Sequence, residues 1–156
     1  MNDHTGAARN MYRFLESTVH QYMTRAVTTV TRQITMRELE ALFETHDFNS
    51  FPVVEKGKML GIVTKFDFLR AFAFTTGQMV PHYDELMRRP VGEMMTEAVV
   101  HVEPIAPLTR VLQLMVSLKS RSFPVIGPDR QLVGIISRED VIHALKEATQ
   151  DVRETR

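Results

Sequence analysis

The chain has 156 residues, 44% of them hydrophobic and 24% charged, which are the proportions of an ordinary globular protein with a substantial core. Its 19 basic and 19 acidic residues give a formal net charge of zero, which argues against a protein whose main task is to bind nucleic acid. Because cysteine is absent, disulfides, thiolate metal sites and cysteine nucleophiles are excluded.

The N-terminal segment carries charged residues throughout and lacks the apolar core of a signal peptide. No stretch approaches the ~18 consecutive apolar residues that span a bilayer, so we expect a cytoplasmic protein without a membrane partner. Met11, Phe14, Leu15 and Val19 recur at helical spacing, which predicts an extra helix in an N-terminal extension over residues 1–18.

Residues 19–74 predict the order strand, helix, strand, strand, helix. A short extended stretch at Val27–Val30 precedes a helix that begins with a capping box of Thr35 and Glu38. The segments "FPVV" and "MLGIV" then flank the polar turn "EKGK", which indicates a β-hairpin, and a final helix follows. The apolar face of the first helix comprises Met36, Leu39, Leu42, Phe43 and His46, and that of the final helix comprises Phe68, Leu69 and Phe72.

The same order recurs in residues 91–148, after a linker over 75–90 that contains a helical turn at "HYDELMRR" and before a tail over 149–156. The apolar face of the final helix in this copy comprises Val141, Ile142 and Leu145. At an offset of 72 residues, "SFPV" at Ser50–Val53 falls on "SFPV" at Ser122–Val125. One residue is gained in the hairpin turn, and an offset of 73 then aligns "GIVTKFD" with "GIISRED". The chain is therefore a tandem duplication. Each copy is small for independent stability, so we expect the two copies to bury their sheets against each other.

Each copy ends its last strand with the motif G-φ-φ-[S/T]-x-x-D, where φ is an apolar residue; the motifs occupy residues 61–67 and 134–140. A hydroxyl residue followed three positions later by an acid is a common N-terminal capping signal of a helix. The same residue types also suit a nucleotide, because a carboxylate accepts bonds from both hydroxyls of a ribose and a helix N-terminus suits a phosphate. On the residues alone, both interpretations stay open.

The paired "MT" openings, the "FPV" strands and the two G-φ-φ-[S/T]-x-x-D motifs resemble a tandem pair of cystathionine-β-synthase (CBS) domains, the Bateman module. The resemblance covers residues 19–148. It implies an α+β (α/β) fold in which two β-α-β-β-α repeats pack sheet to sheet about a pseudo-twofold axis. It also implies two clefts for adenosine compounds, each combining the [S/T]-x-x-D end of one repeat with the opening strand of the other.

Matching the family's positions to this chain gives two predicted clefts. The first comprises Ile62, Thr64, Lys65, Asp67, Thr96, Val99, His101, Arg121 and Ser122. The second comprises Thr24, Val27, Thr29, Asn49, Ser50, Ile135, Ser137, Arg138 and Asp140.

Different members of these clefts would have different roles. Backbone groups of the opening strands could contact the adenine edge, and Lys65 and Arg138 could add charge for a phosphate. Family members that hold polyphosphates often carry a basic residue just before the "FPV" strand. Arg121 stands there in the second repeat and Asn49 in the first, so the first cleft ranks first for a phosphorylated ligand. His101 is either a neighbour of the adenine pocket or a surface histidine.

The resemblance implies a stand-alone, non-enzymatic regulatory module that binds AMP, ADP or ATP, ahead of S-adenosylmethionine and NAD, and modulates an unknown protein target. No catalytic triad, phosphate-binding glycine loop or metal-binding histidine spacing occurs in the sequence. Two alternatives stay open: a ligand-free dimerisation or scaffolding module, and an accessory protein whose cleft completes another chain's active site. A homodimer is expected in each case, with the apolar final helices, such as "FLRAFAF" at Phe68–Phe74, as the contact surface.

Overall fold

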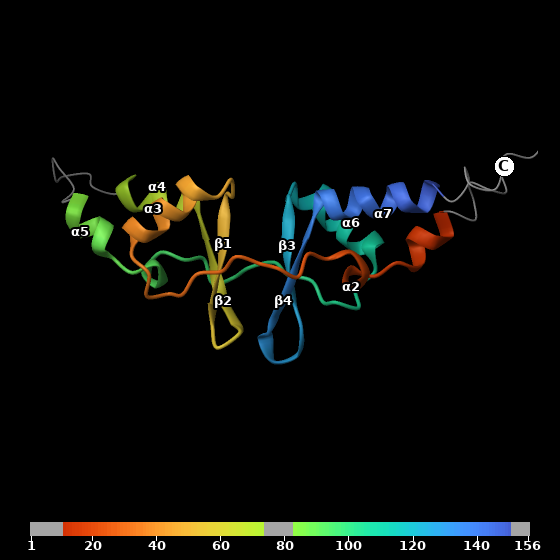
Figure 1. Ribbon diagram of the computed structural model, residues 1–156, viewed down its shortest axis with the longest axis horizontal. Helices are drawn as coiled ribbons and strands as arrows, with labels where there is room; N and C mark the ends of the chain where they lie inside the picture. The colour runs from red at the N-terminus through yellow and green to blue at the C-terminus, as the bar shows by residue number, and fades with distance from the viewer. Residues whose placement is uncertain (1–10, 74–82, 151–156) are drawn as a thin grey trace, which may run out of the picture. The chain divides into compact units, whose positions relative to one another are not determined.

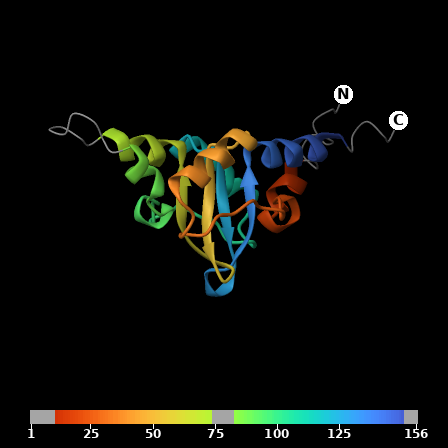
Figure 2. The ribbon, with the colours of Figure 1, turned by 60° about the vertical axis from the view of Figure 1, so that its left-hand side comes forward.

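The structure is a computed structural model that describes residues 11–73 and 83–150, and these residues form two compact units (Figure 1). The first unit contains the described residues up to Val27 and from Val100 onward, and the second contains those within Thr28–Val99. Each unit has one two-stranded antiparallel sheet with helices, and Figure 2 shows these elements from a second direction. Each unit also has its own hydrophobic core. The predicted mixture of helix and sheet is therefore confirmed.

The second unit is built on the hairpin of β1 (Ser50–Glu55) and β2 (Lys58–Thr64). Lys56 and Gly57 in the turn both have positive φ, 52° and 78°, which is the backbone conformation that a two-residue turn of type I′ requires. The predicted hairpin at "EKGK" is therefore confirmed. The other elements of this unit are α3 (Met36–Thr45), α4 (Lys65–Ala73), α5 (Tyr83–Arg88) and the 3₁₀ turn η1 (Val91–Glu93).

Local signals account for several of these elements. Thr35 Oγ1 accepts a hydrogen bond from the Glu38 backbone at 3.2 Å, and Glu38 Oε2 accepts one from the Thr35 backbone at 2.8 Å. The predicted capping box at the start of α3 is thus confirmed, and α5 confirms the helical turn expected at "HYDELMRR". The core of the second unit comprises Val30, Met36, Leu39, Phe51, Val53, Val63, Met87, Val91 and Met94.

The first unit repeats this arrangement around the hairpin of β3 (Ser122–Ile126) and β4 (Leu132–Ser137). Its helical elements are α2 (Val19–Tyr22), α6 (Leu108–Leu118), the 3₁₀ turn η2 (Pro128–Arg130) and α7 (Arg138–Gln150). Residues 11–16 are also helical, as expected for the N-terminal extension, and Phe14 is buried in the core of this unit.

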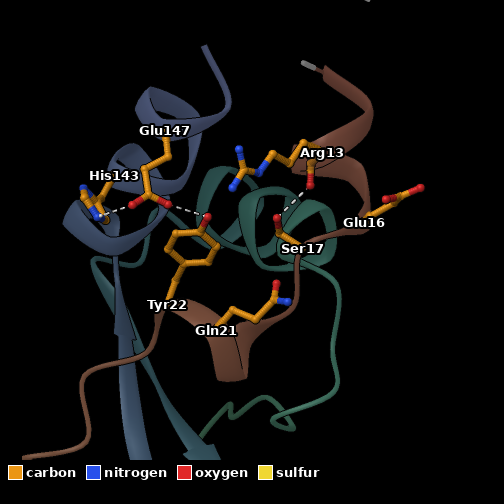
Figure 3. A pocket seen from close by; sticks show the side chains of 7 residues that line it. All are labelled: Arg13, Glu16, Ser17, Gln21, Tyr22, His143 and Glu147. Carbon is orange, nitrogen blue, oxygen red and sulfur yellow. Dashed lines mark hydrogen bonds and ion pairs between the residues drawn. The ribbon is translucent and has the colours of Figure 1, made fainter. Parts of the chain in front are cut away.

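The N-terminal part of the first unit is joined to α7 through Tyr22 (Figure 3). The Tyr22 hydroxyl donates a hydrogen bond of 2.7 Å to Glu147 Oε2, and His143 Nε2 lies 3.2 Å from Glu147 Oε1. The hydrogen bond to Glu147, and after it burial, raises the pKa of Tyr22 above its ordinary value. These side chains line a cavity of about 540 Å³ together with Arg13, Glu16, Ser17 and Gln21.

The opening segments, residues 24–30 and 96–102, differ from the extended strands that the sequence predicts at Val27–Val30 and Val99–Val102. Each is held by isolated β-bridges near its ends: Thr24 to Ile135 and Val30 to Val53 in one, Thr96 to Ile62 and Val102 to Val125 in the other. The boundary between the compact units falls inside both segments, after Val27 and after Val99. Each opening segment is therefore divided between the two units, and neither part is long enough to form a continuous β-ladder with the sheet of its unit.

This arrangement means that the compact units do not coincide with the sequence repeats. Each unit combines the hairpin and helices of one repeat with the first residues of the other repeat's opening segment. The repeat boundaries stay a prediction from the sequence, and the part of the linker at 74–82 and the ends at 1–10 and 151–156 lie outside the described residues.

In each final helix, one residue assigned to the apolar face points outward instead. Leu69 of α4 is 65% exposed and Ile142 of α7 is 63% exposed. In each helix the residues four apart, Phe68 with Phe72 and Val141 with Leu145, face the core, because one face of an α-helix is covered by positions i and i+4. The neighbouring residue lies about 100° further round the helix and stays in solvent.

Candidate functional site

Each unit brings one G-φ-φ-[S/T]-x-x-D motif against the start of an opening segment. In the second unit, Ile62 and Thr96 exchange backbone hydrogen bonds of 2.9 and 2.8 Å. In the first unit, Thr24 and Ile135 do the same at 2.8 and 2.9 Å. We call these places the Asp67 half-site (Ile62, Thr64, Asp67, Thr96) and the Asp140 half-site (Thr24, Ile135, Ser137, Asp140).

The glycine of each motif permits this contact. A Cβ atom added to Gly61 would lie 2.5 Å from the Thr96 carbonyl oxygen, and one added to Gly134 would lie 2.7 Å from the Thr24 carbonyl oxygen. No real Cβ tolerates so close an oxygen, and both neighbours are backbone atoms that cannot rotate away. The glycine is therefore required by the close approach of the opening segment.

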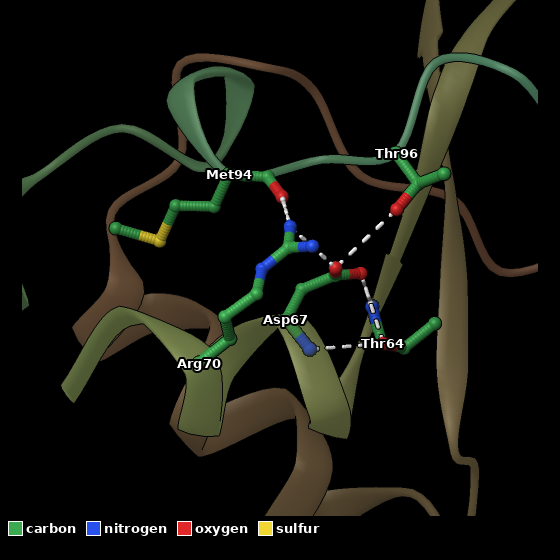
Figure 4. Close-up of polar contacts among 5 residues, drawn as sticks. All are labelled: Thr64, Asp67, Arg70, Met94 and Thr96. Atoms are coloured by element: carbon green, nitrogen blue, oxygen red, sulfur yellow. Dashed lines mark hydrogen bonds and ion pairs between the residues drawn. The ribbon is translucent and has the colours of Figure 1, made fainter. Parts of the chain in front are cut away.

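In the Asp67 half-site the carboxylate is surrounded by donors of its own unit (Figure 4). Asp67 is only 3% exposed. Its Oδ2 accepts hydrogen bonds from the Thr64 amide and hydroxyl, both at 2.9 Å. Its Oδ1 accepts a 3.3 Å bond from the Thr96 hydroxyl and pairs with Arg70 Nη2 at 3.0 Å. Arg70 Nη2 also donates a 3.2 Å bond to the Met94 carbonyl, so the same nitrogen contacts two oxygens.

In the Asp140 half-site the carboxylate is half-buried and less fully engaged. Asp140 Oδ2 accepts bonds from the Ser137 amide at 2.7 Å and the Ser137 hydroxyl at 2.8 Å. Its Oδ1 accepts a long bond of 3.4 Å from the Thr24 hydroxyl. The position three residues after the aspartate is His143 instead of arginine, and the His143 ring is paired with Glu147.

The capping interpretation of both motifs is confirmed. The Thr64 hydroxyl accepts a bond from the Asp67 amide at 3.0 Å, and the Ser137 hydroxyl accepts one from the Asp140 amide at 3.2 Å. The aspartates in turn accept bonds from the Thr64 and Ser137 amides, so each pair is a reciprocal cap at the start of α4 or α7. A cap with a carboxylate at this place also leaves a negative charge near the positive end of the helix dipole.

Two of the basic residues expected to contact a phosphate, Arg138 and Lys65, have other partners. Arg138 donates from Nε to the Ser120 carbonyl at 3.0 Å and from Nη2 to the Lys119 carbonyl at 3.1 Å. It therefore satisfies carbonyls at the C-terminal end of α6, where Lys119 has a left-handed backbone with φ 54°. The Lys65 ammonium lies 5.7 Å from the centre of the Phe43 ring.

The predicted cleft residues are divided between the two units. Ile62, Thr64, Lys65, Asp67, Thr96 and Val99 lie in the second unit, and Thr24, Val27, Ile135, Ser137, Arg138 and Asp140 lie in the first. The remaining members of the first predicted cleft, His101, Arg121 and Ser122, belong to the first unit, and those of the second, Thr29, Asn49 and Ser50, belong to the second unit. Their part in a ligand site stays a prediction.

Arg70 is a residue of the Asp67 half-site that the sequence interpretation missed. The signal was present, because Asp67 and Arg70 are three residues apart on a predicted helix, a spacing that brings opposite charges together. What the spacing alone did not reveal is that the arginine turns inward onto a buried carboxylate and the Met94 carbonyl.

Within residues 11–73 and 83–150, no group of three or more histidine, aspartate and glutamate side chains is placed to hold a metal ion. None of the helices over the same residues is long and apolar enough to cross a membrane.

Comparison with known proteins places these features in a family. The family model of the CBS domain matches residues 19–74 and 91–147. The chain is 34% identical over 133 residues to the uncharacterized protein MJ0188 of Methanocaldococcus jannaschii, covering 84% of this chain and 45% of that protein. It is 31% identical over 125 residues to the CBS domain-containing protein YhcV of Bacillus subtilis, covering 80% of this chain and 83% of that protein. The chain thus spans about half the length of MJ0188, but most of YhcV.

Solved structures share the fold. The crystal structure of CbpB in complex with c-di-AMP superposes with a TM-score of 0.82 and 21% identity, covering 97% of this chain and 99% of that chain. The crystal structure of CBSX2 in complex with AMP superposes with a TM-score of 0.69 and 22% identity, covering 85% of this chain and 98% of that chain. At these identities the similarity establishes the fold alone.

Proposed function

This chain belongs to the CBS-domain family, and from that premise we propose that it is a regulatory module that binds an adenosine-containing ligand and modulates a protein target. One observation carries the proposal: in both units a Thr/Ser-x-x-Asp helix start lies against an exposed opening segment from the other repeat. The similar folds of CbpB, solved with c-di-AMP, and CBSX2, solved with AMP, support an adenosine compound as the ligand. AMP, ADP and ATP are the first candidates, followed by S-adenosylmethionine and NAD.

The opening segments have the right construction for contacting a base. Bridges hold each segment near both ends, and between them only Val27 in one and Val99 in the other are half-buried while their neighbours are exposed. Exposed backbone that is held near both ends can present its amide and carbonyl groups to the edge of an adenine ring at little entropic cost. The aspartates would accept the ribose hydroxyls, and the start of α4 or α7 would face a phosphate.

The same segments offer a route from binding to regulation. The boundary between the compact units lies after Val27 and after Val99, so a ligand that contacts the opening segments contacts the connections between the units. A ligand can shift an equilibrium only by the difference in its affinity for the two states. We infer that the regulated difference lies in these connections, and that the module carries out no reaction itself. Its cytoplasmic location stays a prediction.

A ligand-free scaffolding module is the second candidate, because apolar side chains are exposed on the final helices. Phe66 and Leu69 of α4 are 69% and 65% exposed, and Ile142 of α7 is 63% exposed. Exposed apolar residues gathered on one element often mark a protein interface. We propose a homodimer through these helices for either function.

Thermal unfolding in the presence of nucleotides separates the two candidates. Protein freed of bound nucleotide is heated with AMP, ADP, ATP, S-adenosylmethionine or NAD, and with CMP as the control that lacks adenine. A ligand that binds only the folded state raises Tm by mass action, so we expect at least one adenosine compound to raise Tm and CMP to leave it unchanged. If none of the five raises Tm, the scaffolding module is the better account.

A further inference from the structure

The two half-sites differ in the contacts that their aspartates make within their own unit. Oδ1 of Asp67 has a cation at 3.0 Å, Arg70, and a second donor, the Thr96 hydroxyl, at 3.3 Å. Oδ1 of Asp140 has a single long hydrogen bond of 3.4 Å from Thr24 among the contacts of the described residues. Oδ2 of both aspartates is engaged alike by the cap, so the difference lies at Oδ1 alone.

Arg70 is firmly placed. Its guanidinium pairs with Asp67, donates to the Met94 carbonyl at 3.2 Å, and lies 6.0 Å from the centre of the Phe66 ring. Because Asp67 is 3% exposed, its charge is shielded from water and depends on this partner. Oδ1 already has two partners, so a ribose hydroxyl that approaches it has to displace one of them, and displacing Arg70 separates an ion pair whose carboxylate is buried.

The matching residue in the other half-site does not act in this way. His143 stands three residues after Asp140 on α7, as Arg70 does after Asp67 on α4. Its ring is paired with Glu147 at 3.2 Å and packs edge-on against Tyr22, with ring centres 6.2 Å apart. The Asp140 carboxylate thus keeps an oxygen with only a weak internal partner.

We propose that Arg70 acts as an internal counter-ion that closes the Asp67 half-site, so that the two half-sites bind an adenosine ligand unequally. The Asp140 half-site accepts the ligand first, and the Asp67 half-site binds only when Arg70 leaves the carboxylate. This reverses the ranking that Arg121 suggested from the sequence. The inference rests on the proposed function, because it concerns the same ligand.

Calorimetric titration with AMP tests the inequality. We expect the unmodified chain to show a tighter and a weaker binding step, Asp140→Ala to lose the tighter step, and Asp67→Ala to retain it. Arg70→Ala should strengthen the weaker step by about tenfold, which is the size of one charge-assisted hydrogen bond. Two equal steps in the unmodified chain, or a weaker step that Arg70→Ala leaves unchanged, would overturn the closing role of Arg70.

Transferring the arginine provides the matched control. His143→Arg places a guanidinium three residues after Asp140, and Glu147→Gln in the same variant removes the carboxylate that would otherwise attract it. We expect this double variant to bind AMP about tenfold more weakly at the tighter step than Glu147→Gln alone. Equal affinities in the two variants would count against the proposal.

A measurement without ligand separates failure of this inference from failure of the proposed function. If Arg70 neutralises Asp67, Arg70→Ala lowers Tm in the unmodified chain but much less in an Asp67→Asn background. An equal fall in both backgrounds would overturn the closing contact even if AMP binds. If instead the two backgrounds differ as expected but AMP binds to none of the variants, the contact stands and the proposed function is the part that fails.

Discussion

Single residues explain why the G-φ-φ-[S/T]-x-x-D motif has its form. The glycine admits the carbonyl of an opening segment, and the hydroxyl residue and the aspartate cap a helix. In the first motif, the residue three positions after the aspartate, Arg70, also places a cation beside it. Because these roles belong to different residues, substitutions at the different positions should have different effects on stability and on ligand binding. The motif therefore has a structural role in both units, and the ligand role that we propose for it depends on the contacts that the aspartate already makes.

Gly134→Ala tests the joint. The added methyl group would meet the Thr24 carbonyl oxygen at 2.7 Å, and forcing the backbone apart should lower the free energy of unfolding by about 1–3 kcal/mol. Gly127→Ala in the same unit is the matched control. Its Cβ would lie 3.2 Å from a methyl group of the Val133 side chain, a longer contact than the one with the backbone oxygen at Gly134. Urea denaturation compares the two variants. Similar losses in both would show that the close approach at Gly134 is unimportant.

At the scale of elements, sequence reasoning succeeded where the signal was local. The capping box of Thr35 and Glu38, the "EKGK" hairpin and the duplication itself depend on residues a few positions apart, and all three are present. The failures concern tertiary context. The opening strands are reduced to bridges because they divide between two units, and Arg138 turns to the end of α6, whose position the sequence around Arg138 does not encode.

Charged partners inside the half-sites were missed for the same reason. Asp67 and Asp140 look alike in sequence, and only the packing shows that Arg70 reaches one carboxylate while His143 turns to Glu147. The exposure of Leu69 and Ile142 likewise follows from which helix face meets the hairpin. The apolar residues of these helices cover more of the helix surface than the hairpin does, so the sequence alone cannot show which of them stay exposed.

The contact between α2 and α7 makes a prediction for alkaline pH. Because the hydrogen bond to Glu147 and burial raise the pKa of Tyr22 above 10.0, the folded state holds this proton more tightly than the unfolded chain. The contribution of Tyr22 is therefore complete below pH 10 and is lost as the pH rises through the folded-state pKa. Tyr22→Phe should lower the free energy of unfolding by about 1 kcal/mol at neutral pH, and by less in strong alkali.

The matched control for this prediction is Tyr12→Phe, because Tyr12 is 62% exposed. Urea denaturation at several pH values gives the free energy of unfolding of the unmodified chain and of the two variants. The free energy of unfolding of Tyr22→Phe should approach that of the unmodified chain only above pH 10. That of Tyr12→Phe should equal that of the unmodified chain at every pH. A difference between Tyr22→Phe and the unmodified chain that stays constant through the alkaline range would contradict the assigned pKa shift.

The whole molecule combines two small compact units, and its oligomeric state tests whether the exposed helices form a dimer contact. Ile142→Glu places a charge on an exposed position of α7, 63% accessible, without touching the core. We expect the variant to elute as a monomer by size exclusion with light scattering, where the unmodified chain elutes as a dimer, because a charge at an apolar interface loses its hydration. Glu139→Gln, on the same helix, is the control. A dimer that survives Ile142→Glu would exclude this face of α7 as the contact surface.

The most direct test is to find which backbone amides change their chemical shift when AMP is added. Backbone amide NMR spectra, recorded as AMP is added, should show shifts first around Thr24–Thr29 and Ser137–Asp140, the opening segment and helix start beside the more accessible carboxylate. The amides of Asp67 and Arg70 should respond later in the titration. Shifts absent altogether, or confined to the cavity between Arg13 and Glu147, would contradict the proposed ligand site.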